Sequence, residues 1–189
     1  MPIDRTLTRR ASIIYAETLL GATSGDDSAF EVSGQLEQVL ATVRGSGELR
    51  GVLADRTIPA ERRSELVREV FAGFNAALLE VLVVMVERGD ISLLPRVNEA
   101  YIAAAEEALG SVIIDVTTVI ALDDGLRDSI KKKYSAQFGK EVLLREHVDP
   151  SLVGGIVLST HGRRIDASVV SQLERARTVL ATVSSGGDR

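Results

Sequence analysis

The chain has 189 residues, of which 45% are hydrophobic and 26% are charged, a composition typical of an ordinary globular protein. Its 27 acidic residues outnumber 22 basic ones, and the resulting net charge of −5 argues against a nucleic-acid partner, which needs a basic surface. Cysteine is absent, which excludes disulfides, thiolate catalysis and Cys-ligated zinc or iron–sulfur sites.

Neither the N-terminal segment nor the apolar runs indicate a membrane-directed chain. Charged residues interrupt the first twenty positions, so a signal peptide is not expected: Asp4, Arg5, Arg9, Arg10 and Glu17. The longest apolar run, Ala76–Val86, is shorter than the roughly 18 residues that a membrane span requires, and it contains Glu80. We therefore expect a soluble, cytoplasmic chain with no direct membrane insertion.

Residues 1–109 carry helical periodicity and helix-ending signals. In the first helix the apolar spacing predicts a single buried face: Leu7, Ala11, Ile14, Tyr15, Leu19 and Ala22. A second helix is expected over residues 29–44, and a short one follows the break at RGSGE. In the next helix Thr57 is a candidate cap and Pro59 suits the first turn. Two further helices, over 76–87 and 91–109, bring the total to about six and predict a helical bundle.

The segment Ala76–Val86 is apolar nearly all round. Its valines would also suit a buried strand, but its length and the glycine stop at RGD favour a helix. Such a helix either lies at the centre of the bundle or has one face in the core and a second face for a partner. The residue pattern leaves both interpretations open.

After Gly110 the spacing of the apolar residues changes from a helical period to alternation along the chain. A β-branched run over residues 111–122 predicts a strand, and a helix with Leu126, Ile130, Tyr134 and Phe138 follows it. The runs KEVLLREHV, GIVLST and RRID predict strands, and the last helix carries an apolar stripe that packs on the hairpin or on a partner: Val169, Leu173, Ala176, Leu180 and Val183. The predicted fold class is α+β, mainly α, with a six-helix N-terminal bundle over 1–109 and a small β-α-β-β-α C-terminal domain over 110–189.

No constellation of residues supports catalysis, a cofactor or a metal. Gly154 and Gly155 could cradle phosphate with Arg163 and Arg164, but these glycines lead into a strand, whereas a phosphate-binding loop leads into a helix. The chain has only two histidines, too few for an ordinary zinc centre. Ser151 or Ser159 with His161 and Asp166 lacks a nucleophile elbow. We predict no catalytic, cofactor-binding or metal-binding residue.

The C-terminal run VDPSLVGGIVLSTHGRRIDASVVSQLERARTVL closely resembles the signature of the bacterial F-type ATP synthase delta subunit family, which is homologous to the mitochondrial oligomycin-sensitivity-conferring protein. Three other stretches are similar to family motifs: YAETLL, VVMVERGDISLLPRVNEAY and DVTTVIALDD. The resemblance covers nearly the whole chain. It departs from the family pattern at Ala167 in place of a usual Gly, at Asp90 where Arg is frequent, and at Thr18 where Ala is common.

The resemblance implies a non-catalytic stator subunit at the cytoplasmic face of the cell membrane. In the family, a groove between the first and fifth helices receives the N-terminal helix of an alpha subunit, and the C-terminal part meets the b subunits of the peripheral stalk. Motif matching places five residues on or beside that groove: Tyr15, Thr18, Glu80, Val83 and Val84. For the stalk we predict the hairpin and last helix around Arg163, Arg164 and Leu173.

Two other kinds of function remain as alternatives at the level of sequence. One is a generic helical adaptor whose small α+β module senses a ligand. The other is an enzyme, although no residue pattern supports a catalytic site. Reconstitution with a stripped ATP synthase head separates the adaptor from the stator, since only the stator would restore coupling. Strong thermal stabilisation by a nucleotide or an amino acid would favour ligand sensing.

Overall fold

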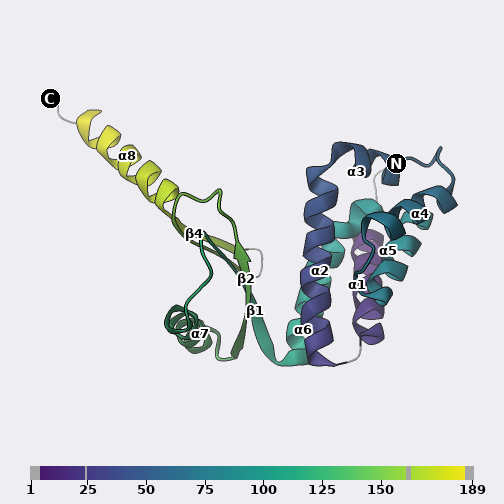
Figure 1. Ribbon diagram of the computed structural model, residues 1–189, viewed down its shortest axis with the longest axis horizontal. Coiled ribbons are helices and arrows are strands. Elements are labelled where there is room, and N and C mark those ends of the chain that lie inside the picture. Colours follow the sequence, from purple (N-terminus) through teal and green to yellow (C-terminus); the bar gives the residue numbers. More distant parts are fainter. Residues whose placement is uncertain (1–4, 24, 161–162, 186–189) are drawn as a thin grey trace. The chain divides into compact units, whose positions relative to one another are not determined.

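The computed structural model describes residues 5–23, 25–160 and 163–185, and it is mainly helical with one small mixed sheet (Figure 1). The chain divides into two compact units, Met1–Leu109 and Gly110–Arg189. Among the helices of the described residues, none is both long and apolar enough to cross a membrane.

In the described part of the first unit, every regular element is a helix. Its helices are α1 (Arg5–Ala22), α2 (Asp26–Gly45), α3 (Gly47–Ala54), α4 (Ala60–Val70), α5 (Ala76–Arg88), the 3₁₀ helix η1 (Ile91–Leu93) and α6 (Leu94–Leu109). Local chemistry sets several of their ends. The Ser46 hydroxyl accepts from the Leu49 N–H at the start of α3, and the Asn75 side chain accepts from the Ala77 N–H at the start of α5. Gly89 ends α5 in the left-handed conformation, with φ at 73°.

The predicted cap of α4 was wrong. Thr57 does not cap this helix, because its N–H and its hydroxyl both donate to the Asp55 carboxylate, at 2.8 and 2.7 Å. These bonds hold the preceding turn, and they lower the pKa of Asp55. Pro59 stands at the N-cap position of α4, which has no side-chain cap.

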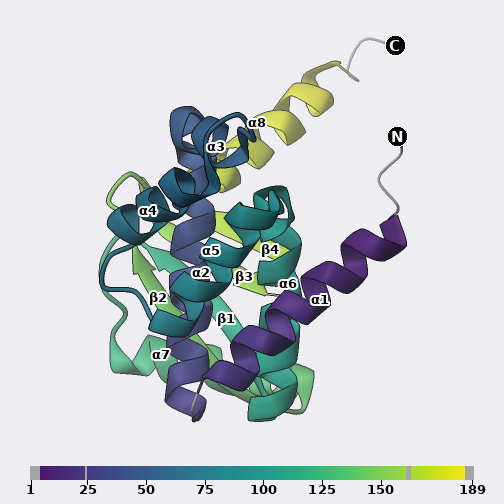
Figure 2. The same ribbon diagram turned by 90° about the vertical axis from the view of Figure 1, so that its right-hand side faces the viewer.

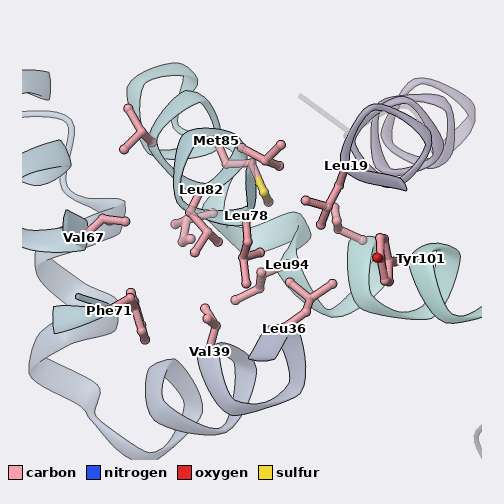
Figure 3. Packing of buried hydrophobic residues seen from close by; sticks show 14 of the residues in the cluster. Leu19, Leu36, Val39, Val67, Phe71, Leu78, Leu82, Met85, Leu94 and Tyr101 are labelled. Carbon is pink, nitrogen blue, oxygen red and sulfur yellow. The ribbon is translucent and has the colours of Figure 1, made fainter. Parts of the chain in front are cut away.

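The core of the first unit is built around α5 (Figure 3). Leu78, Leu82 and Met85 of this helix are at most 1% exposed. They pack in one cluster with large side chains from the other helices, among them Leu19, Leu36, Val39, Val67, Phe71, Leu94 and Tyr101. The buried Tyr101 hydroxyl donates to the Ala29 carbonyl at 3.3 Å, which ties α6 to α2.

A buried arginine joins three segments of this unit. Arg63 of α4 is 4% exposed, and its Nη1 donates to the Leu53 carbonyl at 3.2 Å and to the Val86 carbonyl at 2.7 Å. Its Nε donates to the Ile58 carbonyl at 3.1 Å. Leu53 and Val86 lie in the last turns of α3 and α5, so the guanidinium also meets the negative ends of two helices.

The second unit is a four-stranded sheet with two helices, so the predicted β-α-β-β-α order was one strand short. Its elements are β1 (Ser111–Thr118), α7 (Asp124–Phe138), β2 (Glu141–Val148), β3 (Gly155–Thr160), β4 (Arg163–Ser168) and α8 (Val169–Ser185). The strand order is β2-β1-β3-β4. β1 and β2 are parallel and connected through α7, whereas β3 pairs antiparallel with both β1 and β4.

The core of the second unit lies between the sheet and α7. Val112, Ile114 and Val116 alternate along β1 and pack with Ile130 and Tyr134 of α7. The strand predicted over 111–122 ends earlier, at Thr118. Of the apolar positions predicted on α7, Leu126 is 45% exposed and so lies outside this core.

Gly155 shows why the Gly-Gly pair stands before β3. Its φ is +90°, and a Cβ added there would lie 2.5 Å from the Ala167 carbonyl oxygen and 2.7 Å from the Ser168 Cα. Next to it, the Gly154 carbonyl accepts from the Val169 N–H at 3.0 Å. The pair therefore lets the start of β3 approach the junction of β4 and α8, which is a structural role.

Candidate partner-docking faces

The first helix turns a different face to the core than its apolar spacing predicts. Ser12, Ala16 and Leu19 are at most 2% exposed, whereas Leu7 is 64% and Ile14 is 61% exposed. The prediction of one buried face through Leu7 and Ile14 was wrong, because α1 carries two apolar stripes and only one packs in the core. The other stripe is exposed to solvent.

On α5 the neighbouring residues Val83 and Val84 lie in different environments. Val83 is 4% exposed and belongs to the core, so a docked helix could not reach its side chain without opening that core. Val84 is 40% exposed, one helical turn after the exposed Glu80. This helix thus has a core face and a second, solvent-facing one, so it is not buried all round.

Helices α1 and α5 are in contact, and α1 runs beside α5 in Figure 2. Thr18 is exposed one turn after Ile14. We define the α1–α5 face by Ile14, Tyr15, Thr18, Glu80 and Val84. The predicted residues in this definition are at least partly exposed, whereas Val83 is buried; that the face binds a partner stays a prediction.

Tyr15 connects α1 to the turn that ends α5. Its hydroxyl donates to Asp90 Oδ2 at 2.9 Å, and the Asp90 carboxylate lies 3.8 Å from Arg88 Nε. Burial of the phenol raises the pKa of Tyr15 to about 12, helped by the hydrogen bond to Asp90 and by its negative charge. The Asp90 that departs from the family pattern thus has a defined role here as the acceptor for Tyr15.

Glu80 faces α4. Arg68 Nη1 donates to Glu80 Oε1 at 2.7 Å and Nη2 to Oε2 at 3.5 Å. The hydrogen bond from Arg68, followed by its charge, lowers the pKa of the exposed Glu80 carboxyl. Glu80 thus borders the α1–α5 face on its α4 side and stays charged at neutral pH.

The second unit has an apolar stripe on α8. Leu173 is 64% exposed, and Val169 and Val170 are 38% and 42% exposed. With the exposed Ala176 they form the α8 stripe, following helical spacing along one side of the helix. Leu180 and Val183, which the sequence places on the same stripe, have side chains outside the described part of the structure.

The hairpin beside α8 holds the other two predicted residues. Arg163 starts β4 opposite Thr160, and its side chain is outside the described residues, as is His161. Arg164 is exposed, with its Nη2 3.7 Å from Asp166 Oδ2. The hypothetical site of Ser151 or Ser159 with His161 and Asp166 therefore lies partly outside the described residues.

Asp166 and Ser168 set the start of α8. The Asp166 carboxylate accepts from the Ser168 N–H at 2.9 Å, and the Ser168 hydroxyl accepts from the Ser171 N–H at 3.3 Å. The contacts of Asp166 with Ser168 lower the pKa of this carboxyl. Asp166 is thus a turn and capping residue, and Ala167 fits between the two without a left-handed backbone.

Sequence reasoning missed the exposed residues that extend these faces. The apolar spacing predicts Leu7 and Ile14 inside the bundle, and the predicted stripe of the last helix does not include Val170. The heptad spacing of Leu7 and Ile14 was a usable signal, since Ser12, Ala16 and Leu19 already supply a compact stripe on another side of the helix.

The fold resembles a chain in a cryo-EM structure of the Toxoplasma gondii mitochondrial ATP synthase hexamer, with a TM-score of 0.53 and 18% identity over 90% of this chain and 97% of that one. A profile of the ATP synthase delta (OSCP) subunit family matches residues 12–180. ATP synthase subunit delta of Geobacter sp. (strain M21) is 31% identical over 170 residues, covering 88% of this chain and 93% of that protein. The corresponding protein of Rhodopirellula baltica is 31% identical over 163 residues, covering 85% and 72%.

The chain belongs to the ATP synthase delta (OSCP) subunit family. The resemblance drawn from its C-terminal motif is thereby confirmed. Membership of this family does not favour the alternative of an unrelated adaptor with a ligand-sensing module.

Proposed function

We propose that this protein is a non-catalytic stator subunit of an F-type ATP synthase, bound peripherally at the cytoplasmic face of the cell membrane. The six α-helices of residues 1–109 would form a bundle that holds the catalytic head, and the second unit would hold the peripheral stalk. Rotation would then remain coupled to proton-driven ATP synthesis. The observation that carries this proposal is the exposed apolar stripe on α1 beside Val84 of α5, in a chain of this family.

The α1–α5 face suits an amphipathic helix, here the N-terminal helix of an alpha subunit. Ile14 and Val84 offer apolar surface, which Leu7 extends along α1, while Glu80, Thr18 and Tyr15 supply polar groups at the borders of the face. Burying about 600 Å² of apolar surface contributes a gross 15 kcal/mol or so at about 25 cal/mol/Å². Association and side-chain ordering cost roughly 4–15 kcal/mol, so tight binding depends on close packing and on attachment at both units.

The test uses the full chain and a peptide with the sequence of an alpha-subunit N-terminus from the same enzyme. Val84→Asp would place a charge in the contact and is expected to weaken calorimetric binding at least about a hundred-fold. Val70→Asp is the matched control, since Val70 is 43% exposed on α4 and lies outside the face. Unchanged affinity in a folded Val84→Asp variant would refute the placement.

For the stalk end we propose the α8 stripe together with the hairpin around Arg163 and Arg164. Leu173→Asp is expected to weaken binding of a C-terminal b-subunit segment at least about ten-fold, because it places a charge at the most exposed large apolar side chain of the stripe. Val148→Asp, at the 54% exposed end of β2, is the control. Equal losses in both variants would show that the stripe has no special part in stalk binding.

A further inference from the structure

A second groove in the first unit lies away from the α1–α5 face. It is bordered by α2, α3, η1 and the start of α6, and α3 follows α2 at one end of this unit (Figure 1). Its volume is about 600 Å³, which is within the usual range of ligand-binding clefts. We define the α2–α3 groove by Leu40, Arg44, Arg50, Gly51 and Pro95.

The charge of this groove is opposite to that of the whole chain. Arg44 and Arg50 are both exposed, and among the described residues neither guanidinium has an ion pair or hydrogen bond. None of the described residues that line the groove is acidic, although the net charge of the protein is −5. Two free guanidinium groups on an apolar groove select a partner with carboxylates beside apolar side chains.

The apolar wall of the groove is the outer side of the core. Val43 and Ile91 are 6% and 5% exposed and are held in place by core packing, so this wall is rigid. Leu40 is partly exposed along α2. A preformed wall lowers the ordering cost of binding.

On the α3 side of the groove, small residues recur at helical spacing, as they do where two helices pack closely. Gly47, Arg50, Gly51 and Ala54 follow one side of α3 over two turns, about 10 Å. Gly51 is inside the helix, where glycine costs about 0.5–1 kcal/mol relative to alanine, yet a Cβ there would meet nothing within 4 Å. The fold itself therefore gives no reason for this glycine, whereas a second helix packed against α3 could approach closely over it.

We propose that the α2–α3 groove binds an acidic amphipathic helix of a partner protein. The carboxylates of that helix pair with Arg44 and Arg50, and its apolar side chains lie against Leu40 and Pro95. This site is separate from the α1–α5 face, so the proposal stands or falls independently of head binding through Val84.

The probe is a fluorescein-labelled 18-residue helical peptide with a leucine stripe and flanking glutamates, and its partner probe has lysines in place of the glutamates. Binding to the full chain is measured by fluorescence anisotropy in the Val84→Asp background, in which the charge at position 84 disfavours peptide binding at the α1–α5 face. We expect the glutamate peptide to bind the chain and the lysine peptide to bind at least about ten-fold more weakly. The double variant Arg44→Glu/Arg50→Glu is expected to reverse this preference.

A steric variant provides the second readout. Gly51→Leu raises the helix propensity of α3, so it preserves the fold. The leucine side chain fills the groove and is expected to weaken binding of the glutamate peptide at least about ten-fold. Gly21→Leu on α1, where a Cβ also meets nothing within 4 Å, is the matched control and should bind normally. Equal binding of both peptides, no effect of the arginine reversal, or equal losses in both glycine variants would overturn the proposal. So would sedimentation showing that Gly51→Leu breaks a dimer of this chain, since the occupant would then be a second copy.

Discussion

Arg63 offers the sharpest test of how the first unit is held together. In Arg63→Met the guanidinium is lost while the aliphatic stem is approximately kept, so the change removes hydrogen bonds to the Leu53, Ile58 and Val86 carbonyls. The Val86 carbonyl also accepts from the Gly89 N–H at 3.0 Å. The loss therefore falls mainly on the other two carbonyls.

The expected destabilisation follows from those two carbonyls. Each acceptor left without its charged donor costs about 1–3 kcal/mol, at the lower end for the part-buried Ile58 carbonyl, and relief of the arginine's desolvation offsets part of the sum. We expect the free energy of unfolding to fall by about 3 kcal/mol in Arg63→Met. Arg63→Lys should recover only part of this loss, because one ammonium cannot reproduce the planar fork that reaches three segments.

Urea unfolding followed by circular dichroism at 222 nm measures the change, with hydrogen exchange of the α5 amides to localise it. Arg62→Met is the control, since Arg62 is the exposed neighbour of Arg63 and forms a surface ion pair with Glu65 at 3.3 Å. It should cost less than about 1 kcal/mol. If Arg63→Met cost no more than Arg62→Met, the view of Arg63 as a buried tie between helix ends would be wrong.

Two further predictions concern Tyr15 and the glycine before β3. The folded-state pKa of Tyr15 is raised from 10.0 to about 12, so the contribution of Tyr15 to stability is complete below pH 10 and is lost as pH rises toward 12. The difference in unfolding free energy between the wild type and Tyr15→Phe should therefore shrink between pH 10 and pH 12. A difference that stays constant over this range would contradict the prediction. Gly155→Ala should destabilise the second unit by more than about 2 kcal/mol, because its Cβ would collide with the Ala167 carbonyl, whereas Gly139→Ala, at φ 67° with open space around it, should cost about 1 kcal/mol in the same urea titration.

The sequence determined the local structure of this protein. Helical spacing, β-branched runs and glycine stops located the helices and strands within a few residues, because those signals act over one or two turns of chain. The glycine stop at RGD could be read in this way, and Gly89 does end α5. The motif order also identified the family.

Only the tertiary structure decided which apolar faces are used inside. On α1 the apolar stripe through Leu7 and Ile14 is as hydrophobic as the stripe that contains Leu19. The packing of α5 and α6 against α1 decides which of the two is buried. The same packing places Val83 in the core and leaves Val84 open. The physical reason is that hydrophobic burial is non-directional along a single helix, so its orientation is settled only when neighbouring helices compete for the same surface.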